Sequence, residues 1–408
     1  MSEQYHPIYG EEAGMVSPQL ASLRTALAER TYPGYPSLNE RFNADPTTLA
    51  VDAIGRLVVP DGPWTVDDHP DQPQPEHAPT LARQDELLAQ GLELDSQGRP
   101  LHPWFLEMVG DAAIGVALGK GNSWEWGVNH TVDSMVVCGD HVLLIRRGDT
   151  GQLALPGGFR GNDTDEAAML RELVEETGLR PDENARITTL YDGPVADIRD
   201  TANAWKETRA FLVEVPFTGT LPEVHGGDDA TAAIWMPRRE VWNQLEPLFG
   251  SHDFLLARGI DYLNYKRAMI DQIAGALHGI WLSPYLKPDG SYEPRIRTTI
   301  DAEWIAVHGT DQVNIANPDF DALPEDWQAE NVAAAEVIFR LLEDSNWTLN
   351  PADREHYEYA GKVIHDAWLA RNPQAKGGPL DVPFNELPES EQVKDINHVY
   401  AARSVLGL

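Results

Sequence analysis

Hydrophobic and polar positions follow different patterns in three parts of the chain, and the central part predicts a sheet. There, short apolar runs rich in β-branched residues predict strands. These runs cover residues 131–138, 141–146, 152–155, 186–191, 208–215 and 232–236. One helical pattern, at about 165–177, lies among them. Strands interleaved with a few helices are typical of an α/β or α+β domain.

The N-terminal part carries shorter signals. Leucines recurring along one side predict a helix at 17–31, and a second helical pattern covers 81–90. Residues 51–60 suit a short β-hairpin. Residues 60–79 hold six prolines, which indicates a connector. We interpret the first 111 residues as a small lobe with no visible chemistry of its own.

From about residue 252 the pattern is helical almost to the end, and it contains an internal repeat. Residues 320–328 and 384–392 share the order Phe-x-x-Leu-Pro-Glu, and each of two earlier segments carries His-x-x-Trp, at His278 and His365. The two pairs are offset by 64 and 87 residues, so the first copy carries an insertion of 23 residues, which we place between Tyr285 and Thr310. Repeats that share apolar anchors indicate stacked units.

Composition limits the classes of partner. The chain has 408 residues and a formal net charge of −34, which disfavours nucleic acid and anionic membranes. A phosphate-binding site in such a protein needs local cations or a metal. The single cysteine, Cys138, excludes an intrachain disulfide. We see no signal peptide and no apolar run of about 18 residues, so we expect a soluble, cytoplasmic protein.

The candidate chemistry lies where the third predicted strand ends. Gly157-Gly158 permits a tight turn, Asp163 or Thr164 can cap the helix that follows, and Gly178 can end it. We expect this helix to bury a face formed by three apolar residues, Ala167, Leu170 and Val174.

Another face of this helix is crowded with carboxylates. Glu172, Glu175 and Glu176 stand at i, i+3 and i+4, and each like-charged pair costs about 4 kcal/mol at 4 Å and an effective dielectric of 20. Mg²⁺ prefers carboxylate oxygen and keeps positions open for phosphate, so it would offset that cost. Arg171 lies four residues before Glu175 and can hold its side chain. Alternatively, the cluster is a solvated acidic face, which is common.

The whole segment resembles the Nudix box, G-x5-E-x7-R-E-U-x-E-E-x-G-U with U aliphatic. This resemblance implies a Nudix α/β/α sandwich that hydrolyses a diphosphate linkage with Mg²⁺, or with Mn²⁺ as the alternative ion. It implies that Arg171 and the three glutamates are the catalytic residues, and that the glutamates and Gly157 hold the metal. Two features depart from the box: Asp163 replaces its first Glu, and the loop after Gly158 is one residue shorter. The residue that acts as general base stays open.

The flanking segments resemble the ADP-ribose pyrophosphatases of the animal mitochondrial type and the ADP-ribose-sensing domain of a melastatin-type channel. They are Gly119–Gly121, Trp126–Asp133, Asp197–Thr208 and Gly227–Ala230. This resemblance implies substrate contacts from the following residues: His130, Thr131, Gly157, Gly158, Asp197, Arg199, Asn203 and Asp228. A guanidinium suits a phosphate, and aspartates suit sugar hydroxyls. Alternatively, His130 is a satisfied core histidine, and Asp228 with Asp229 caps a turn.

The C-terminal pattern resembles the paired repeat of ryanodine receptors, with the first copy altered by its insertion. We therefore expect three parts: a lobe at 1–111, a Nudix domain at 112–266 and tandem repeats at 267–408, the copies covering about 270–346 and 356–408. The resemblance leaves open a ligand or protein partner of the repeats, and the sequence fixes no oligomeric state.

Together the resemblances imply Mg²⁺-dependent hydrolysis of ADP-ribose to AMP and ribose 5-phosphate. Two alternatives remain at this point. The substrate is another nucleoside diphosphate derivative, such as NADH, or the protein is an ADP-ribose sensor with little turnover. The complete set of Glu172, Glu175 and Glu176 favours an enzyme.

Overall fold

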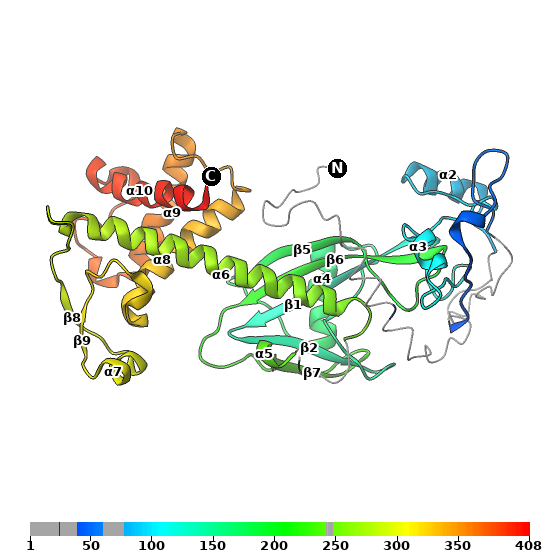
Figure 1. Cartoon of the computed structure of the whole chain (residues 1–408), viewed down its shortest axis with the longest axis horizontal. Coiled ribbons are helices and arrows are strands. Elements are labelled where there is room, and N and C mark those ends of the chain that lie inside the picture. The colour runs from blue at the N-terminus through cyan, green and yellow to red at the C-terminus, as the bar shows by residue number, and fades with distance from the viewer. Residues whose placement is uncertain (1–23, 25–38, 60–76, 242, 244–247) are drawn as a thin grey trace. The chain divides into compact units, whose positions relative to one another are not determined.

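A computed structural model describes Arg24 and residues 39–59, 77–241, 243 and 248–408. The chain divides into two compact units, Met1–Ile260 and Asp261–Leu408, which we call the N-terminal and C-terminal units and describe separately (Figure 1). The helix expected at 17–31, apart from Arg24, and most of the connector at 60–79 lie outside the described residues.

The N-terminal unit is built on a mixed sheet whose main path has the order β3-β2-β1-β6-β5. Its strands are β1 (Gly127–Cys138), β2 (His141–Arg147), β3 (Leu153–Ala154), β4 (Gly157–Phe159), β5 (Arg186–Pro194), β6 (Ala204–Val215) and β7 (Ala230–Pro237). β1 and β6 run parallel over their full length, and the other pairs are antiparallel. All six strands expected from the sequence are present. β4 was not expected, because a three-residue strand that begins Gly-Gly has little β propensity.

Helix α4 (Asp165–Thr177) lies against this sheet (Figure 1). It begins after Thr164, whose hydroxyl accepts the Ala167 N–H, and it ends at Gly178, whose φ of 71° favours glycine. Its apolar residues pack with those of β1, β2 and β6 in one core: Val132, Val136, Leu143, Ala168, Met169, Leu173, Phe211 and Val213.

The expected buried face of α4 was wrong in phase. Ala168, Met169 and Leu173 are buried, whereas Ala167 is exposed and Leu170 is only half-buried. The helix turns inward the side that also carries Glu172 and Glu176, which are buried as well. The spacing of apolar residues alone cannot predict which face of a helix is buried when that face includes two carboxylates.

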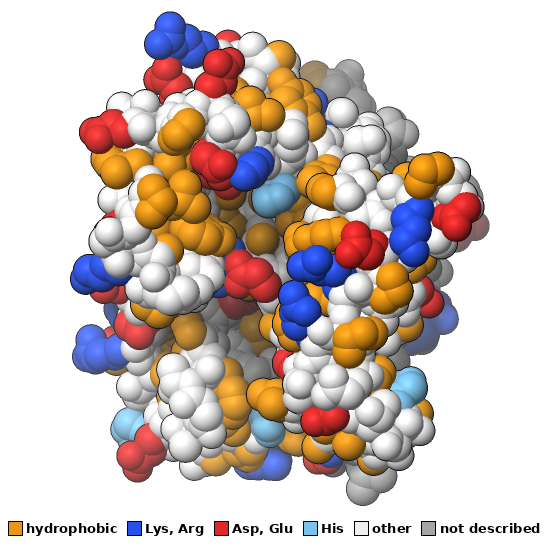
Figure 2. Space-filling view, turned by 90° about the vertical axis from the view of Figure 1, so that its left-hand side faces the viewer, with side chains coloured by type: hydrophobic (Ala, Val, Ile, Leu, Met, Phe, Trp, Pro, Cys, Tyr) orange, Lys and Arg blue, Asp and Glu red, His pale blue; other side chains and the backbone are white. Residues whose placement is uncertain are grey.

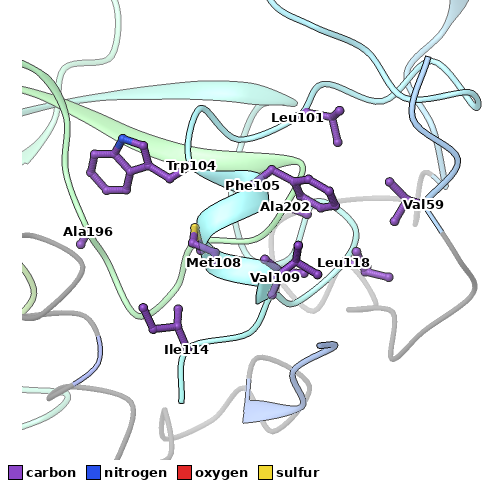
Figure 3. Packing of buried hydrophobic residues seen from close by; sticks show 11 residues of the cluster. Val59, Leu101, Trp104, Phe105, Met108, Val109, Ile114, Leu118, Ala196 and Ala202 are labelled. Carbon is purple, nitrogen blue, oxygen red and sulfur yellow. The ribbon is translucent and has the colours of Figure 1, made fainter. Parts of the chain in front are cut away.

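The N-terminal lobe has its own apolar core, and that core includes residues of the central domain (Figure 3). The described elements of the lobe include helices α2 (Leu81–Ala89) and α3 (Phe105–Gly110) and a short 3-10 turn, η2 (Pro46–Thr48). The buried side chains that the lobe contributes to this core are Val59, Leu101, Trp104, Phe105, Met108 and Val109. They are joined by Ile114, Val116 and Leu118, which follow the lobe, and by Ala196 and Ala202 from the segment between β5 and β6. The lobe therefore packs directly on that segment.

The hairpin expected at 51–60 is reduced to a single antiparallel bridge between Val51 and Leu57. The carboxylate of Asp52 accepts the N–H groups of Ile54 and Arg56 and closes the turn. Val59 then leaves the pairing and becomes buried in the core of the lobe. An isolated two-stranded hairpin is only marginally stable. Burial of the Val59 side chain therefore outweighs further strand pairing, and the hairpin ends there.

The C-terminal unit is mostly helical. Helix α6 (His252–Leu282) runs across the division at residues 260 and 261, and α7 (Ala302–His308), α8 (Glu325–Asp344), α9 (Arg354–Arg371) and α10 (Glu389–Leu406) follow. A two-stranded sheet, β8 (Ile296–Thr298) with β9 (Gln312–Asn314), brackets α7. β8 and α7 lie in the segment between Tyr285 and Thr310 in which we placed the insertion, and β9 follows directly after it. Four 3-10 turns complete the unit: η3 (Ser283–Tyr285), η4 (Phe320–Ala322), η5 (Pro373–Ala375) and η6 (Phe384–Glu386).

The two segments with shared sequence make matching contacts. His278 and His365 are both buried, and each Nε2 lies within hydrogen-bond distance of backbone carbonyls: 2.8 Å from Asn317, and 3.1 Å from Leu380 and Val382. Each imidazole also stacks on the tryptophan three residues later. Gln328 and Gln392 donate to the carbonyls of Leu323 and Leu387. The shared sequence thus has a shared local structure.

The described residues include no helix that is both long and apolar enough to cross a membrane. A short helix, α5 (Arg238–Val241), follows β7 in the N-terminal unit.

Close packing at Gly361 of α9 gives a stability prediction. A Cβ there would lie 2.1 Å from the ring of Phe384, whose side chain is buried, whereas a Cβ at Gly279 of α6 would meet nothing within 4 Å. We expect Gly361→Ala to lower the free energy of unfolding by about 1–3 kcal/mol through overpacking. Gly279→Ala should raise it by roughly 0.5–1 kcal/mol. Urea denaturation of both variants measures this, and equal effects would contradict the packing.

Candidate active site

One cavity in the N-terminal unit brings most of the expected site residues together. Its volume is about 420 Å³. The expected residues that line it are Thr131, Gly157, Gly158, Arg171, Glu172, Glu176, Asp197, Arg199 and Asp228. Three expected residues do not line it: His130, Glu175 and Asn203.

The carboxylates of Glu172 and Glu176 are fixed by the Gly-Gly turn. Both stand one helical turn apart on α4 and are 9% and 2% exposed. The N–H of Gly157 donates to Glu176 Oε2 at 2.8 Å. A Cβ at Gly158 would lie 2.6 Å from the carboxyl carbon of Glu172. Only glycine permits so close an approach of β4 to the helix, which explains why the turn needs this residue.

Burial and neighbouring carboxylates change the protonation of this pair. Burial, together with Asp229 and Glu172, raises the pKa of Glu176 to about 9, although the Gly157 N–H opposes the shift. Burial also raises the pKa of Glu172, since the nearby charges of Glu175 and Asp228 add to it and Arg171 only partly offsets it. Without a cation, Glu176 therefore carries a proton at neutral pH.

Arg171 ties the acidic residues of the box to the turn. Its Nη1 donates to Glu172 at 2.7 Å and to Glu175 at 3.2 Å, and its Nη2 donates to the carbonyl of Phe159 at 3.0 Å. Its Nε donates to Asp163 at 3.0 Å. Asp163, which stands where the box has Glu, thus still orients Arg171. Glu175 is exposed and reaches the site only through this arginine.

The donor set fits a hard divalent cation. Two buried carboxylates with raised pKa values and a third beside them are the oxygen ligands that Mg²⁺ prefers. A cation would relieve the repulsion that burial intensifies. In the described part of the chain no three His, Cys, Asp or Glu side chains already stand as a ready ligand group, and Arg171 holds Glu172 and Glu175 instead.

A cationic wall, which we define as Arg147, Phe249 and Arg199, lines the same cavity. The two guanidinium carbons lie 4.3 and 5.2 Å from the centre of the buried Phe249 ring. Asp149 holds Arg147 through two hydrogen bonds of 2.9 Å, and Asp197 holds Arg199 through bonds of 2.6 and 2.8 Å. Sequence reasoning found Arg199 but missed Arg147 and Phe249.

The cationic wall reaches the carboxylates through Asp229. Arg147 Nη2 lies 3.7 Å from Asp229 Oδ2, and Asp229 is hydrogen-bonded to Glu176. Burial would lower the pKa of Arg147, but Asp149 and Asp229 outweigh burial and raise it. Burial would likewise raise the pKa of Asp197, but Arg199 and Lys206 hold it well below its usual range. Despite burial, the pKa of Asp149 is also lowered, mainly by its hydrogen bonds to Arg147, so the wall is charged and the two aspartates that hold it, Asp149 and Asp197, are ionised.

Asp133 and His252 form a second group that sequence reasoning missed, and both line the cavity. The Leu155 N–H donates to His252 Nδ1 at 2.8 Å, so the proton of the neutral ring lies on Nε2, 3.5 Å from Asp133 Oδ1. Thr208 donates to the other oxygen of Asp133 at 2.5 Å. Burial lowers the pKa of His252, which keeps the ring neutral. The group connects β1 with Leu155, which lies two residues before the Gly-Gly turn.

The N-terminal lobe positions the loop that carries Asp197 and Arg199. The guanidinium of Arg41 donates to the carbonyls of Ile198 and Asp200 at 2.6 and 3.0 Å. Asn203 is fully buried: its oxygen accepts the Gly119 N–H and its amide donates to the Pro100 carbonyl, both at 2.9 Å. The structure therefore gives Asn203 a structural place instead of the substrate contact that we expected. The described residues of the lobe line no part of the cavity, but they support the site.

Asp228 and His130 have contrasting positions. Asp228 lines the cavity with a φ of 50°, an uncommon backbone conformation for a residue other than glycine. His130 is exposed, and the charges that act on its pKa come from Arg160, Glu207, Asp165 and Asp192, none of which lines the cavity. Successive residues of a strand point to opposite faces, so Thr131 reaches the cavity and His130 does not.

Comparisons with known proteins decide the family. The NUDIX domain family matches residues 128–257. An ADP-ribose pyrophosphatase of Methanocaldococcus jannaschii is 30% identical over 141 residues, which are 33% of this chain and 73% of the relative. The chain belongs to the Nudix hydrolases.

Two further Nudix relatives share less of their length. The "putative nudix hydrolase 6" of Caenorhabditis elegans is 33% identical over 173 residues, 39% of this chain and 62% of the relative. The mitochondrial ADP-ribose pyrophosphatase of Rattus norvegicus is 26% identical over 199 residues, 40% of this chain and 53% of the relative. The chain thus spans little more than half of these two relatives.

The raised pKa of Glu176 in this Nudix hydrolase predicts that metal binding releases a proton. At pH 7.5 we expect release of about one proton per Mg²⁺ bound, and an affinity that rises with pH until the carboxyl is ionised near pH 9. Calorimetry in two buffers of different ionisation enthalpy measures the proton count. Glu176→Gln should abolish the release, whereas Glu166→Gln, exposed on the same helix, should retain it. Equal counts in both variants would refute the assignment.

Proposed function

We propose that this Nudix hydrolase cleaves ADP-ribose to AMP and ribose 5-phosphate with Mg²⁺ as its ion. The observation that carries the proposal is the cavity, in which the carboxylates of the Nudix box face the same space as Asp197, Arg199 and Asp228. Two relatives are named ADP-ribose pyrophosphatases, which supports the same substrate.

Two groups of residues that line the cavity would have separate roles, one in holding the metal and one in binding the substrate. Glu172, Glu175 and Glu176 would hold Mg²⁺, which when bound neutralises the diphosphate and activates the attacking water. Arg171 orients two of these glutamates, and the Gly157 N–H orients the third. A bond forms between the water oxygen and one phosphorus while the bridging P–O bond breaks, and the proton of the water passes to a base.

The opposite side would bind the substrate. Arg147 and Arg199 offer donors to the diphosphate oxygens, and their charge is what a phosphate needs in a strongly acidic protein. Asp197 and Asp228 offer acceptors to ribose hydroxyls. The ring of Phe249 excludes water beneath both guanidinium groups, which strengthens their interaction with an anion.

For the C-terminal unit, we propose tandem repeats of the ryanodine-receptor type. His278 and His365 make equivalent contacts in their own copies, and so do Gln328 and Gln392, which supports a duplicated unit.

Hydrolysis of ADP-ribose by the full chain tests the proposal. We expect AMP release in millimolar Mg²⁺ and none in EDTA. Glu176→Gln should lower kcat by at least about a hundredfold while ADP-ribose still binds, because only the charge that holds the metal is removed. Glu166→Gln on the same helix is the matched control. Binding of ADP-ribose without AMP release in the wild type would favour the sensor alternative, and cleavage of NADH instead would change the substrate.

Arg147 supplies a separate prediction about the cationic wall. Arg147→Gln should lower kcat/KM by about 10²- to 10³-fold, since it removes a fixed cationic donor beside the diphosphate. Arg146→Gln is the matched control, because the neighbouring side chain is exposed and donates to the Gly151 carbonyl. Free guanidinium should restore part of the rate to Arg147→Ala. A rate in Arg147→Gln equal to that of Arg146→Gln would remove Arg147 from the site.

A further inference from the structure

The insertion in the first copy is fastened to the first turn of α8. Asp326 accepts the Thr299 hydroxyl at 2.5 Å and the Ile300 N–H at 3.0 Å, and the Trp327 indole donates to the Thr298 carbonyl at 3.2 Å. In the second copy, serine and glutamate stand at the positions of Asp326 and Trp327. The residues that bind the insertion are therefore found only in the first copy. The insertion is thus an ordered part of the C-terminal unit, held by specific hydrogen bonds.

A second anchor holds α7 against the same turn. Asp301 accepts the Trp304 N–H at 2.9 Å and also the Glu325 N–H at 3.0 Å, which joins the first turns of α7 and α8. The Trp304 indole reaches the Ala322 carbonyl at 3.4 Å, and its ring stacks on His308 with 4.0 Å between ring centres. These contacts fix the positions of the side chains beside them before any partner arrives.

The anchored insertion and the turn enclose a hollow of about 700 Å³, separate from the catalytic cavity. Its apolar lining includes Trp304, Leu323, Ile300 and Val307, and the last two side chains are 84% and 79% exposed. Figure 2 looks onto the side on which α7 and the β8–β9 pair lie in Figure 1, and it shows hydrophobic side chains gathered in groups with acidic ones between them. Two β-branched side chains held so far into water beside a hollow mark a contact surface.

The rim of the hollow has one sign of charge. Its acidic residues are Asp301, Glu303, Asp321, Glu325 and Asp326, and no Lys or Arg lines it. Asp301 and Asp326 are used by the anchors described above. Within the part of the chain that the structure describes, the carboxylates of Glu303, Asp321 and Glu325 make no ion pair with a Lys or Arg.

We propose that this hollow binds a polypeptide segment that presents one or two large apolar side chains between Lys or Arg residues. The apolar side chains would cover Ile300, Val307 and Trp304, and the flanking cations would meet Glu303, Asp321 and Glu325. The acidic rim opposes an anionic membrane and nucleic acid, since either would bring phosphate against carboxylate. Because the anchors already hold the hollow in shape, binding of the segment requires little further ordering of the protein, and the entropic cost to affinity is small.

Selection from a phage-displayed library of random twelve-residue peptides on the full chain tests the proposal. Enriched sequences should carry an apolar residue flanked by Lys or Arg. Ile300→Ser with Val307→Ser should weaken the synthetic peptides at least tenfold, and both substitutions change exposed side chains that hold no part of the fold.

A matched pair separates the hollow from the general acidity of the protein. Glu325→Gln should weaken binding about threefold or more, whereas Glu389→Gln, at the same place in the second copy where no insertion lies, should not. The proposal is overturned if no peptide is enriched, if enriched peptides lack cations, or if they bind the double variant equally well. It is also overturned if sedimentation shows wild-type dimers that the double variant abolishes, because the occupant would then be a second copy of this chain.

Discussion

The burial of two like-charged carboxylates, Glu172 and Glu176, is the constraint on which the rest of the N-terminal unit depends. Solvation that water would have supplied must come from the protein or from a cation, and an uncompensated buried charge costs several kcal/mol. The protein supplies part of it, through Arg171 on one carboxylate and the Gly157 N–H on the other. The raised pKa of both glutamates shows that this supply is incomplete. A divalent cation would complete it, so the proposed binding of metal would follow from the way α4 packs.

That constraint explains where the sequence could be interpreted and where it could not. Strands and helix ends follow from apolar runs and from caps such as Thr164 and Gly178, and the structure has them as expected. The phase of α4 does not follow, because a face that buries two glutamates violates the apolar pattern. Arg147, Phe249, Asp133 and His252 had no local motif. They meet only because β1, β2 and the residues at and just before the start of α6 come together in the folded chain. No single segment of the sequence predicts that these elements lie side by side.

Asn203 shows the opposite failure, in which a resemblance misplaced a residue. A segment with many polar residues was interpreted as a row of substrate contacts, and Asp197 with Arg199 does reach the cavity. Asn203 lies four residues further along the chain, where the loop turns into the lobe, and both ends of its amide hold backbone groups. Polar residues in a loop near a site divide between binding and holding the loop. Burial of the side chain separates the two roles, and burial is not visible in one sequence.

The overall charge of the protein opposes an anionic substrate only if distance is ignored. At physiological ionic strength the screening length is about 8 Å, so carboxylates far from the cavity repel a diphosphate weakly. What the proposed substrate would meet is local: two guanidinium groups held on Phe249, and a cluster of carboxylates that a metal would neutralise. Each guanidinium is itself paired with an aspartate, so neither is a simple positive charge waiting for an anion. The pairing costs affinity but fixes geometry, and fixed donors stabilise a transition state more than mobile ones do.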